Sequence, residues 1–285
     1  MNWKDCLAAD GAVDPAAVAA ALYSARQAGA TLDELLSAEL GLSVEDAYRV
    51  QDQMTALRLA GGERVVGWKL GYTSAAMREQ MGVASPNFGP LTDVMVLDSP
   101  AVLPSGALQP RVEPEIGLRL RRRLVPPFSV EAVLDACDAA LACLEIVDSV
   151  WTGYRFTLAD NTADGSSAAW VATGSELPLT GLESLPVTLL VDGEAVESGT
   201  GAAASGHPAA GVVWLAERLA TRGAWLEPGD LVITGGLTRA PSLEPGHRIS
   251  ASFGDGRWDV EVRRLLSSGR SMWQKSPPCL WLSLY

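Results

Sequence analysis

Alternating apolar and polar positions predict strands in the middle of the chain. In residues 65–70, apolar side chains alternate with Gly67 and Lys69, so Lys69 is expected on a strand face where a glycine leaves room. Residues 116–120 alternate in a similar way, and residues 144–150 form a third, mainly apolar segment. The sequence therefore predicts three strands with few charged residues, and Lys69 is one of these charged residues.

Helix-start signals dominate the first sixty residues. Asp14-Pro15 places an N-cap residue before a proline at the first helical position, and an alanine-rich run follows. Ser43 opens another segment that has acidic residues in its first turn and ends at two glycines. Helices are predicted at residues 14–27, 31–39 and 43–60, and also at 129–143 and 207–222.

The C-terminal half is predicted to be rich in strands. Asp192-Gly193 suits the tight turn of a hairpin between residues 187–191 and 194–197. Residues 87–92 are expected to form a loop, and further strands are predicted at 231–234, 248–253 and 257–264. We therefore expect an α+β fold: a helical region at 1–62, a β-rich domain at 63–264, and an atypical tail at 265–285 without apolar periodicity.

Composition narrows the classes of protein that this chain can belong to. It has 285 residues, 48% hydrophobic and 20% charged, with a formal net charge of −12. An acidic chain without a basic stripe is not expected to bind nucleic acid. No apolar run is long enough to cross a membrane, and the N-terminus lacks a signal-peptide core. Four cysteines without a disulfide or zinc spacing indicate reduced thiols and a cytoplasmic location.

Three glutamates are the candidate metal ligands. Glu113 and Glu115 are two residues apart at the start of a predicted strand, so their side chains should project together. Glu145 lies in an apolar strand, where an unpaired carboxylate is costly unless it binds a cation. Carboxylates suit Mg²⁺ or Mn²⁺ better than zinc, and three ligands leave positions free for a 2-oxo acid. The spacing alone is also compatible with a solvated Glu-Pro-Glu turn.

Seven segments of the chain occur in an order that is typical of one family. They are Gly67–Ser74, Met81–Val83, Pro86–Gly89, Val112–Ile116, Leu144–Ser149, Ala159–Asn161 and Gly229–Gly236. This series resembles the 2-keto-4-pentenoate hydratase / 4-oxalocrotonate decarboxylase family, which is part of the fumarylacetoacetate hydrolase superfamily. The resemblance covers residues 10–264 and implies a mixed β-rich roll of the superfamily's C-terminal-domain type. It also implies a lyase that uses a divalent metal to act on a 2-oxo-alkenoate or 2-hydroxydienoate.

The resemblance also implies roles for individual residues. It points to a metal held by Glu113, Glu115 and Glu145. Catalytic roles are expected for Lys69, Asp160 and Asn161, and substrate-binding positions at Leu70, Asn87 and Asp164. Lys69 would move a proton or stand near the substrate carboxylate. Asp160 and Asn161 are equally well explained as turn-forming residues.

The resemblance leaves the reaction open between decarboxylation of a 2-oxo-3-enedioate and hydration of 2-hydroxypenta-2,4-dienoate. Related hydratases often carry Asp where this chain has Asn87, and Asn cannot act as a base. This difference slightly favours decarboxylation, whereas an acid at Asp164 would repel a second substrate carboxylate.

Other functions remain open. The alternatives are an acylpyruvate-type C–C hydrolase, a biosynthetic tautomerase or cyclase, and a non-catalytic partner subunit. The hydrolase would need a histidine base, for which the chain offers only His207 and His247. The expected partner is a small 2-oxo acid. The chain is expected to form a homo-oligomer, or a complex with a related hydratase or decarboxylase.

Overall fold

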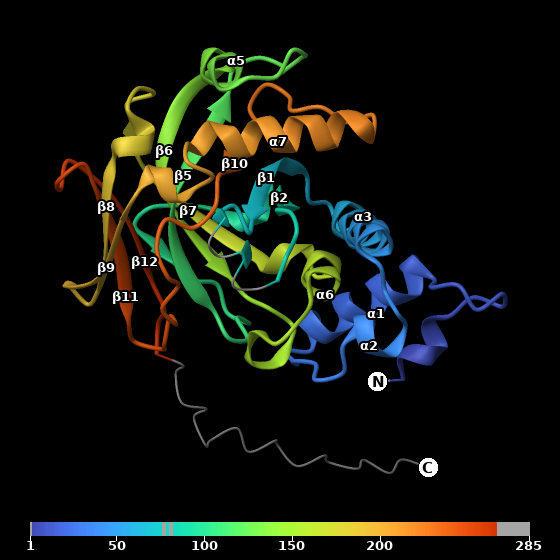
Figure 1. Ribbon diagram of the computed structural model, residues 1–285. Helices are drawn as coiled ribbons and strands as arrows, with labels where there is room; N and C mark the ends of the chain where they lie inside the picture. Colours follow the sequence, from blue (N-terminus) through green and yellow to red (C-terminus); the bar gives the residue numbers. More distant parts are fainter. Residues whose placement is uncertain (1, 76–77, 80–81, 267–285) are drawn as a thin grey trace, which may run out of the picture.

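The computed structural model describes residues 2–75, 78–79 and 82–266 (Figure 1). The helices are α1 (Pro15–Gln27), α2 (Leu36–Glu39), α3 (Val44–Ala60), α5 (Val130–Ala136), α6 (Leu158–Ala163) and α7 (Pro208–Thr221), with short 3₁₀ turns between elements. The strands are β1 (Val65–Gly71), β2 (Asn87–Thr92), β3 (Val96–Asp98), β4 (Ala101–Val102), β5 (Arg111–Leu120), β6 (Cys137–Val147), β7 (Ala168–Leu177), β8 (Pro186–Val191), β9 (Glu194–Thr200), β10 (Leu231–Ile233), β11 (Arg248–Phe253) and β12 (Trp258–Arg263).

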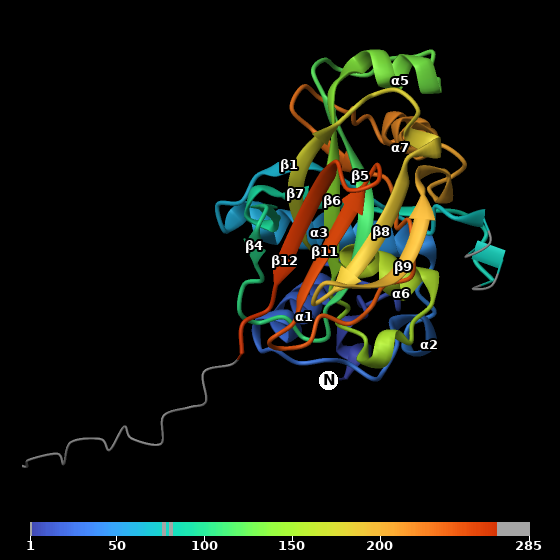
Figure 2. The same ribbon diagram turned by 90° about the vertical axis from the view of Figure 1, so that its left-hand side faces the viewer.

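Two mixed β-sheets form the centre of the molecule. The larger sheet has the strand order β2-β1-β10-β5-β6-β7-β3, and the smaller has the order β4-β12-β11-β8-β9. The smaller sheet faces the viewer in Figure 2, with the larger sheet behind it. The long antiparallel pair β5 and β6 occupies the interior of the larger sheet. This arrangement confirms the expected α+β, β-rich fold.

Capping side chains fix the ends of the helices where the sequence predicted them. Asp14 Oδ1 accepts hydrogen bonds from the backbone N–H groups of the first turn of α1, and Ser43 Oγ accepts one at α3. His207 caps α7 through Nδ1, which lies 3.0 Å from the Ala209 nitrogen. The predicted hairpin forms between β8 and β9, where Asp192 and Gly193 both adopt positive φ.

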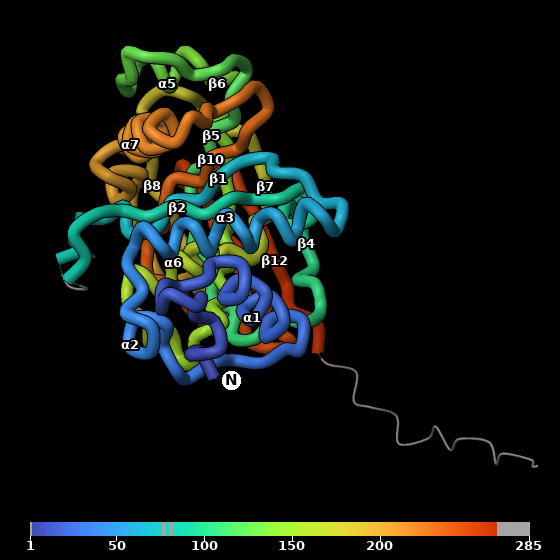
Figure 3. Tube along the Cα trace, turned by 90° about the vertical axis from the view of Figure 1, so that its right-hand side faces the viewer, coloured from blue at the N-terminus to red at the C-terminus, as the bar shows by residue number. Residues whose placement is uncertain are grey.

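The N-terminal helices share a hydrophobic core with a later part of the chain. In Figure 3 α1 and α3 lie together over one side of the molecule, close to α6. Their buried side chains include Leu22 and Val50, and they cluster with Trp151, Ala159 and Ala163. The boundary after residue 62 therefore stays a prediction, since the apolar contacts of this region continue into residues 150–163.

Three sequence predictions are wrong in extent or type. The helix predicted at 129–143 ends at Ala136, and β6 begins at Cys137. β6 is buried between β5 and β7, so its small apolar residues lack the alternation of a half-exposed strand. The predicted loop at 87–92 is strand β2, which pairs with β1, and the helix predicted at 31–39 shortens to Leu36–Glu39.

No helix in the described part of the chain is long and apolar enough to span a membrane. Most of the atypical tail predicted at 265–285 lies outside the described residues.

Candidate metal centre

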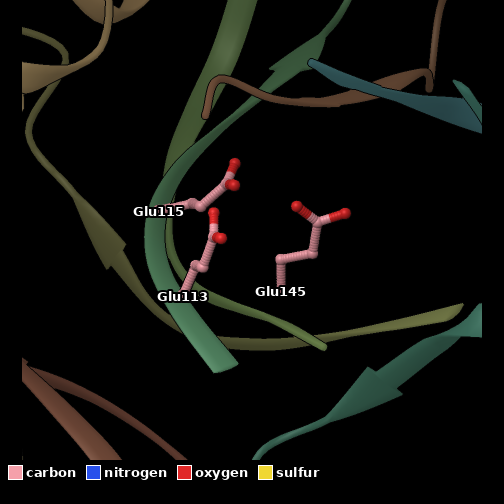
Figure 4. Close-up of side chains that lie close together, drawn as sticks. All are labelled: Glu113, Glu115 and Glu145. Atoms are coloured by element: carbon pink, nitrogen blue, oxygen red, sulfur yellow. The ribbon is translucent and has the colours of Figure 1, made fainter. Parts of the chain in front are cut away.

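Strands β5 and β6 bring the three predicted glutamates together. Glu113 pairs directly with Glu145 across the two strands, and Glu115 follows two residues later on the same face of β5. Each residue offers a carboxylate oxygen, and these oxygens lie within 4.8 Å of one another. Figure 4 shows the three carboxylates directed into one shared space. Glu115 and Glu145 are buried, whereas Glu113 is partly exposed.

Two glycines after β10 make room for this cluster. The Gly235 N–H donates a 2.7 Å hydrogen bond to Glu115 Oε2, and Gly235 has a φ of +105°. A Cβ on Gly236 would collide with the carboxylate of Glu113, whose Cδ would lie 3.0 Å away. Gly235 and Gly236 belong to a segment that resembles the family, but their sequence context predicted no function for them. A Gly-Gly pair directly after an apolar strand was the available signal.

Burial and mutual repulsion make all three glutamates hard to ionise. Burial, followed by the charge of Glu145, raises the pKa of Glu113 to about 7. Burial and the charges of Glu145 and Glu113 raise the pKa of Glu115 well above its ordinary value. The pKa of Glu145 is also raised by burial, although Lys69 opposes the rise. A group of carboxylates in this state gains from any cation that enters it.

Lys69 supplies a positive charge to the cluster from β1. Its Nζ lies 3.1 Å from Glu145 Oε1, and both side chains are almost fully buried. Burial alone would lower the pKa of Lys69, but the charges of Glu145, Glu115 and Glu113 outweigh it, so the pKa is raised. Lys69 Nζ also donates to the backbone oxygen of Ser166 at 2.9 Å and to its Oγ at 3.3 Å. The lysine is therefore held in place as an ammonium ion.

A chain of buried hydrogen bonds continues from Lys69 through Ser166. Ser166 Oγ donates to Asn87 Oδ1 at 2.9 Å. Asn87 Nδ2 donates to Asn161 Oδ1 at 2.9 Å and to Thr162 Oγ1 at 3.0 Å. Ser166 has a positive φ of 58°, a strained conformation for a residue with a side chain, which often marks a functional site. Sequence reasoning found Asn87 and Asn161 but missed Ser166.

Three other predicted site residues lie outside the glutamate cluster. The carboxylate of Asp160 accepts hydrogen bonds from Ser37 in α2 and from Thr157 at the start of α6. The carboxylate of Asp164 pairs with Arg26 at 2.7 Å and accepts from the Val150 nitrogen.

Leu70 points to the opposite face of β1 from Lys69. It packs against α7, where a Cβ on Gly211 would lie 2.8 Å from Leu70 Cδ1. Leu70 is engaged by packing, Asp160 by hydrogen bonds and Asp164 by an ion pair, so the substrate and catalytic roles of these three residues stay predictions.

The donor set of the cluster fits a hard divalent cation. Glu115 Oε1 and both oxygens of Glu145 are buried and accept no hydrogen bond from the described residues, although Oε1 of Glu145 faces the Lys69 ammonium. Buried carboxylate oxygens without donors are costly unless an ion satisfies them. Oxygen ligands match Mg²⁺ and Mn²⁺. Glu113, Glu115 and Glu145 would hold such an ion.

A cavity of about 530 Å³ lies between the residues that follow β1 and the segments that lead into α3 and α6. Tyr72, which follows β1, is one of its lining residues, and the negative charge of Glu113 adds to burial in raising the pKa of Tyr72 to about 12. Thr73 packs against Gly235, whose nitrogen binds Glu115. Tyr72 therefore connects the lining of the cavity with the electrostatic surroundings of Glu113, although none of the three glutamates lines the cavity. Its lining, which includes Leu42, Ser43, Val83, Phe156 and Thr157, contains no charged side chain among the described residues.

Curated proteins of two activities are similar to this chain over most of their length. The 4-oxalocrotonate decarboxylase of Pseudomonas sp. (strain CF600) is 36% identical over 227 residues, covering 78% of this chain and 86% of the relative. The 2-keto-4-pentenoate hydratase of Paraburkholderia xenovorans (strain LB400) is 36% identical over 233 residues, covering 80% of this chain and 87% of the relative. Sequence similarity alone does not separate the two activities.

Among solved structures, the 4-oxalocrotonate decarboxylase from Pseudomonas putida G7, complexed with magnesium and adipate, is similar to this chain. It has a TM-score of 0.83 and 31% identity, and the match covers 88% of this chain and 97% of that chain. The same enzyme has also been solved with calcium and acetate. Residues 66–262 match the model of the fumarylacetoacetate (FAA) hydrolase C-terminal family. The fold, the carboxylate cluster and these similarities together confirm the predicted resemblance: the chain belongs to the fumarylacetoacetate hydrolase family, in its 2-keto-4-pentenoate hydratase / 4-oxalocrotonate decarboxylase branch.

Proposed function

We propose that this chain is a divalent-metal-dependent lyase that acts on a small unsaturated 2-oxo acid or its enol. The observation that carries the proposal is the trio of Glu113, Glu115 and Glu145, whose pKa values are raised. Within it, Glu115 Oε1 and both oxygens of Glu145 are buried and accept no hydrogen bond from the described residues. A divalent cation in that trio supplies a Lewis acid for the 2-oxo group when it is bound.

The remaining chemistry is assigned to residues of the chain. Lys69 is the proposed proton carrier, because Ser166 and Glu145 hold its Nζ at a fixed point beside the cluster. Gly236 leaves space next to the Glu113 carboxylate, and the Gly235 N–H orients the Glu115 carboxylate. The cavity lined in part by Tyr72 is the proposed place for the substrate tail.

Decarboxylation of a 2-oxo-3-enedioate is the favoured candidate reaction. Hydration requires a base that activates water, and the amide of Asn87 cannot supply one. Both donor and acceptor of this amide are also engaged by Asn161, Thr162 and Ser166. Hydration of a 2-hydroxydienoate is the second candidate, because the uncharged cavity lining suits a neutral tail better than a second carboxylate.

Hydrolysis of a C–C bond has less support. His207 uses Nδ1 to cap α7, and its Nε2 lies 3.5 Å from Glu183. His247 lies near Asp192 in a surface turn. Neither histidine is part of the glutamate cluster, so the cluster has no histidine base for water.

We also propose that the protein works in the cytoplasm as a homo-oligomer, alone or with a related hydratase or decarboxylase. Cys6, Cys137 and Cys143 are free thiols, as expected of a reducing compartment. Leu57 and Leu59 are exposed on α3, which supports a contact between subunits. Light scattering would measure the mass of the assembly, and a monomer would contradict this proposal.

Two substrates separate the two candidate reactions. The protein, loaded with Mg²⁺, is incubated with 2-oxo-3-hexenedioate and with 2-hydroxypenta-2,4-dienoate, with Glu145→Gln protein as the control. Release of CO₂ from the first substrate supports decarboxylation. Formation of 4-hydroxy-2-oxopentanoate from the second, without CO₂ from the first, supports hydration. No turnover of either substrate would contradict the proposed function.

A further inference from the structure

Arg111 stands on β5 immediately before the glutamates. Strand alternation places it on the same face as Glu113 and Glu115, at the end of that row. Its backbone is held on both sides, because Arg111 pairs with Val147 in β6 and forms a bridge with Ser242. The backbone of Arg111, and with it the face from which its side chain starts, is therefore fixed by the same strand pair that positions the glutamates.

The guanidinium of Arg111 rests on an aromatic ring and forms no ion pair with the acidic side chains of the described residues. Its Cζ lies 4.2 Å from the centre of the Tyr154 ring. That ring is itself anchored, because the Tyr154 hydroxyl lies 2.8 Å from the Val147 oxygen and 3.1 Å from the Gln109 oxygen. In the described chain, neither an ion pair nor a side-chain hydrogen bond involves the Arg111 guanidinium. Stacking occupies the face of the guanidinium and leaves its in-plane N–H donors available to a planar anion.

With Arg111 included, the net charge of the metal-loaded site favours an anionic ligand. The three glutamates carry three negative charges when ionised, and Lys69 together with one divalent cation cancels them. Arg111 then leaves the loaded site with one positive charge in excess. A 2-oxo acid carries at least one carboxylate, so this excess matches the charge of the ligand that the proposed function requires.

We propose that Arg111 is the anchor for the carboxylate of the 2-oxo acid, with Tyr154 as the platform that keeps its guanidinium aimed at the site. This inference rests on the proposed function and adds a substrate-binding residue to it. A bidentate pair between guanidinium and carboxylate would orient the acid with its 2-oxo group toward the glutamates.

Calorimetry with two probes tests the anchor. Mg²⁺ alone is titrated first, and then oxalate, a planar mimic of an enolised 2-oxo acid, is titrated into the Mg²⁺-loaded protein. Arg111→Met should weaken oxalate binding about 10- to 100-fold, the usual effect of losing a charged hydrogen-bonded pair. Its affinity for Mg²⁺ should stay the same or increase, because a positive charge beside the cluster has been removed.

Two further variants complete the experiment. Arg111→Lys keeps the charge without the planar fork, so its oxalate affinity should fall between those of the wild type and Arg111→Met. It also replaces Arg111→Met if the latter fails to fold. Arg257→Met removes an exposed positive charge from the turn between β11 and β12, away from the cluster, and should leave both affinities unchanged.

The outcomes separate this inference from the proposed function. Unchanged oxalate affinity in Arg111→Met would overturn the anchor, and so would a parallel loss of Mg²⁺ and oxalate binding, which would make Arg111 a structural support of Glu113. A smaller assembly in light scattering, with oxalate binding intact, would instead assign Arg111 to a subunit contact. If the wild type binds Mg²⁺ but not oxalate, the proposed function itself fails, and the anchor fails with it.

Discussion

Replacing Glu113 by glutamine should change how the stability of the metal-free protein depends on pH. Folding raises the pKa of Glu113 from 4.5 to about 7, so the folded state holds this proton more tightly than the unfolded state. Below pH 4.5 both states are protonated, and the carboxyl group causes no penalty. Above pH 7 both states are ionised, and the folded state bears the whole cost of the buried charge.

The size of this effect follows from the same shift. One pH unit corresponds to about 1.4 kcal/mol, so a rise from 4.5 to about 7 costs the folded metal-free protein about 3 kcal/mol at pH 8. The raised pKa values of Glu115 and Glu145 act in the same direction. The pKa of the exposed Asp93 is instead lowered, first by a hydrogen bond from the Arg64 backbone N–H and then by the Arg64 side chain, so this carboxylate does not add to the loss of stability above pH 5. The metal-free wild type should therefore lose stability steadily between about pH 5 and pH 8.

Urea denaturation from pH 5 to pH 8, in EDTA and in Mg²⁺, measures this dependence. Metal-free Glu113→Gln should lose less stability over this range and should exceed the wild type at pH 8 by up to about 3 kcal/mol. Mg²⁺ should stabilise the wild type strongly and the variant only weakly. Glu217→Gln, at an exposed position of α7, is the matched control and should behave like the wild type. A flat pH profile for the metal-free wild type, or an equally steep one for Glu113→Gln, would refute the reasoning.

Three further substitutions have distinct expected results. Lys69→Ala should lower turnover at least about 100-fold while the Mg²⁺-loaded protein stays folded; a large drop in melting temperature with unchanged turnover per folded molecule would make Lys69 structural. Gly236→Ala should weaken Mg²⁺ binding at least tenfold in calorimetry, because its Cβ would displace the Glu113 carboxylate; wild-type affinity would show that the loop shifts freely. Asp164→Asn should lower stability by about 3 kcal/mol in urea, because it breaks the buried pair with Arg26; unchanged stability with reduced turnover would restore the substrate-binding role predicted for Asp164.

Local signals in the sequence correctly predicted the elements that begin at a capping residue or meet at a tight turn. Asp14 and Ser43 begin helices by capping them, and Asp192-Gly193 closes a hairpin, since each depends only on near neighbours. Glu113 and Glu115 could be placed on one face for the same reason, because alternation in a strand is a local rule. Glu145 was identified as the third ligand because it lies in an apolar strand, but its direct pairing with Glu113 was not predicted, since the register between strands is not a local property.

Features that depend on distant parts of the chain could not be predicted in this way. The beginning of β6 at Cys137 is set by two flanking strands that bury both faces, and a short apolar run does not distinguish that environment from a helix. Asp164 meets Arg26 across 138 residues of sequence, so its acidic side chain looked available for substrate. Ser166 accepts a hydrogen bond from Lys69 because it lies in a turn with positive φ, and the residue types around it did not predict this conformation.

The contacts of the N-terminal helices with α6 and the residue after it determine which fragments of the chain can keep the site intact. Ser37 in α2 binds Asp160, and Arg26 in α1 binds Asp164, so the N-terminal helices hold both ends of the segment that leads to Ser166. The region that matches the family model, residues 66–262, contains the glutamates and Lys69 but not Arg26 or Ser37. A fragment limited to residues 66–262 therefore lacks the contacts that hold the segment before Ser166. A fragment or chimera that keeps the complete site must also include α1 and α2.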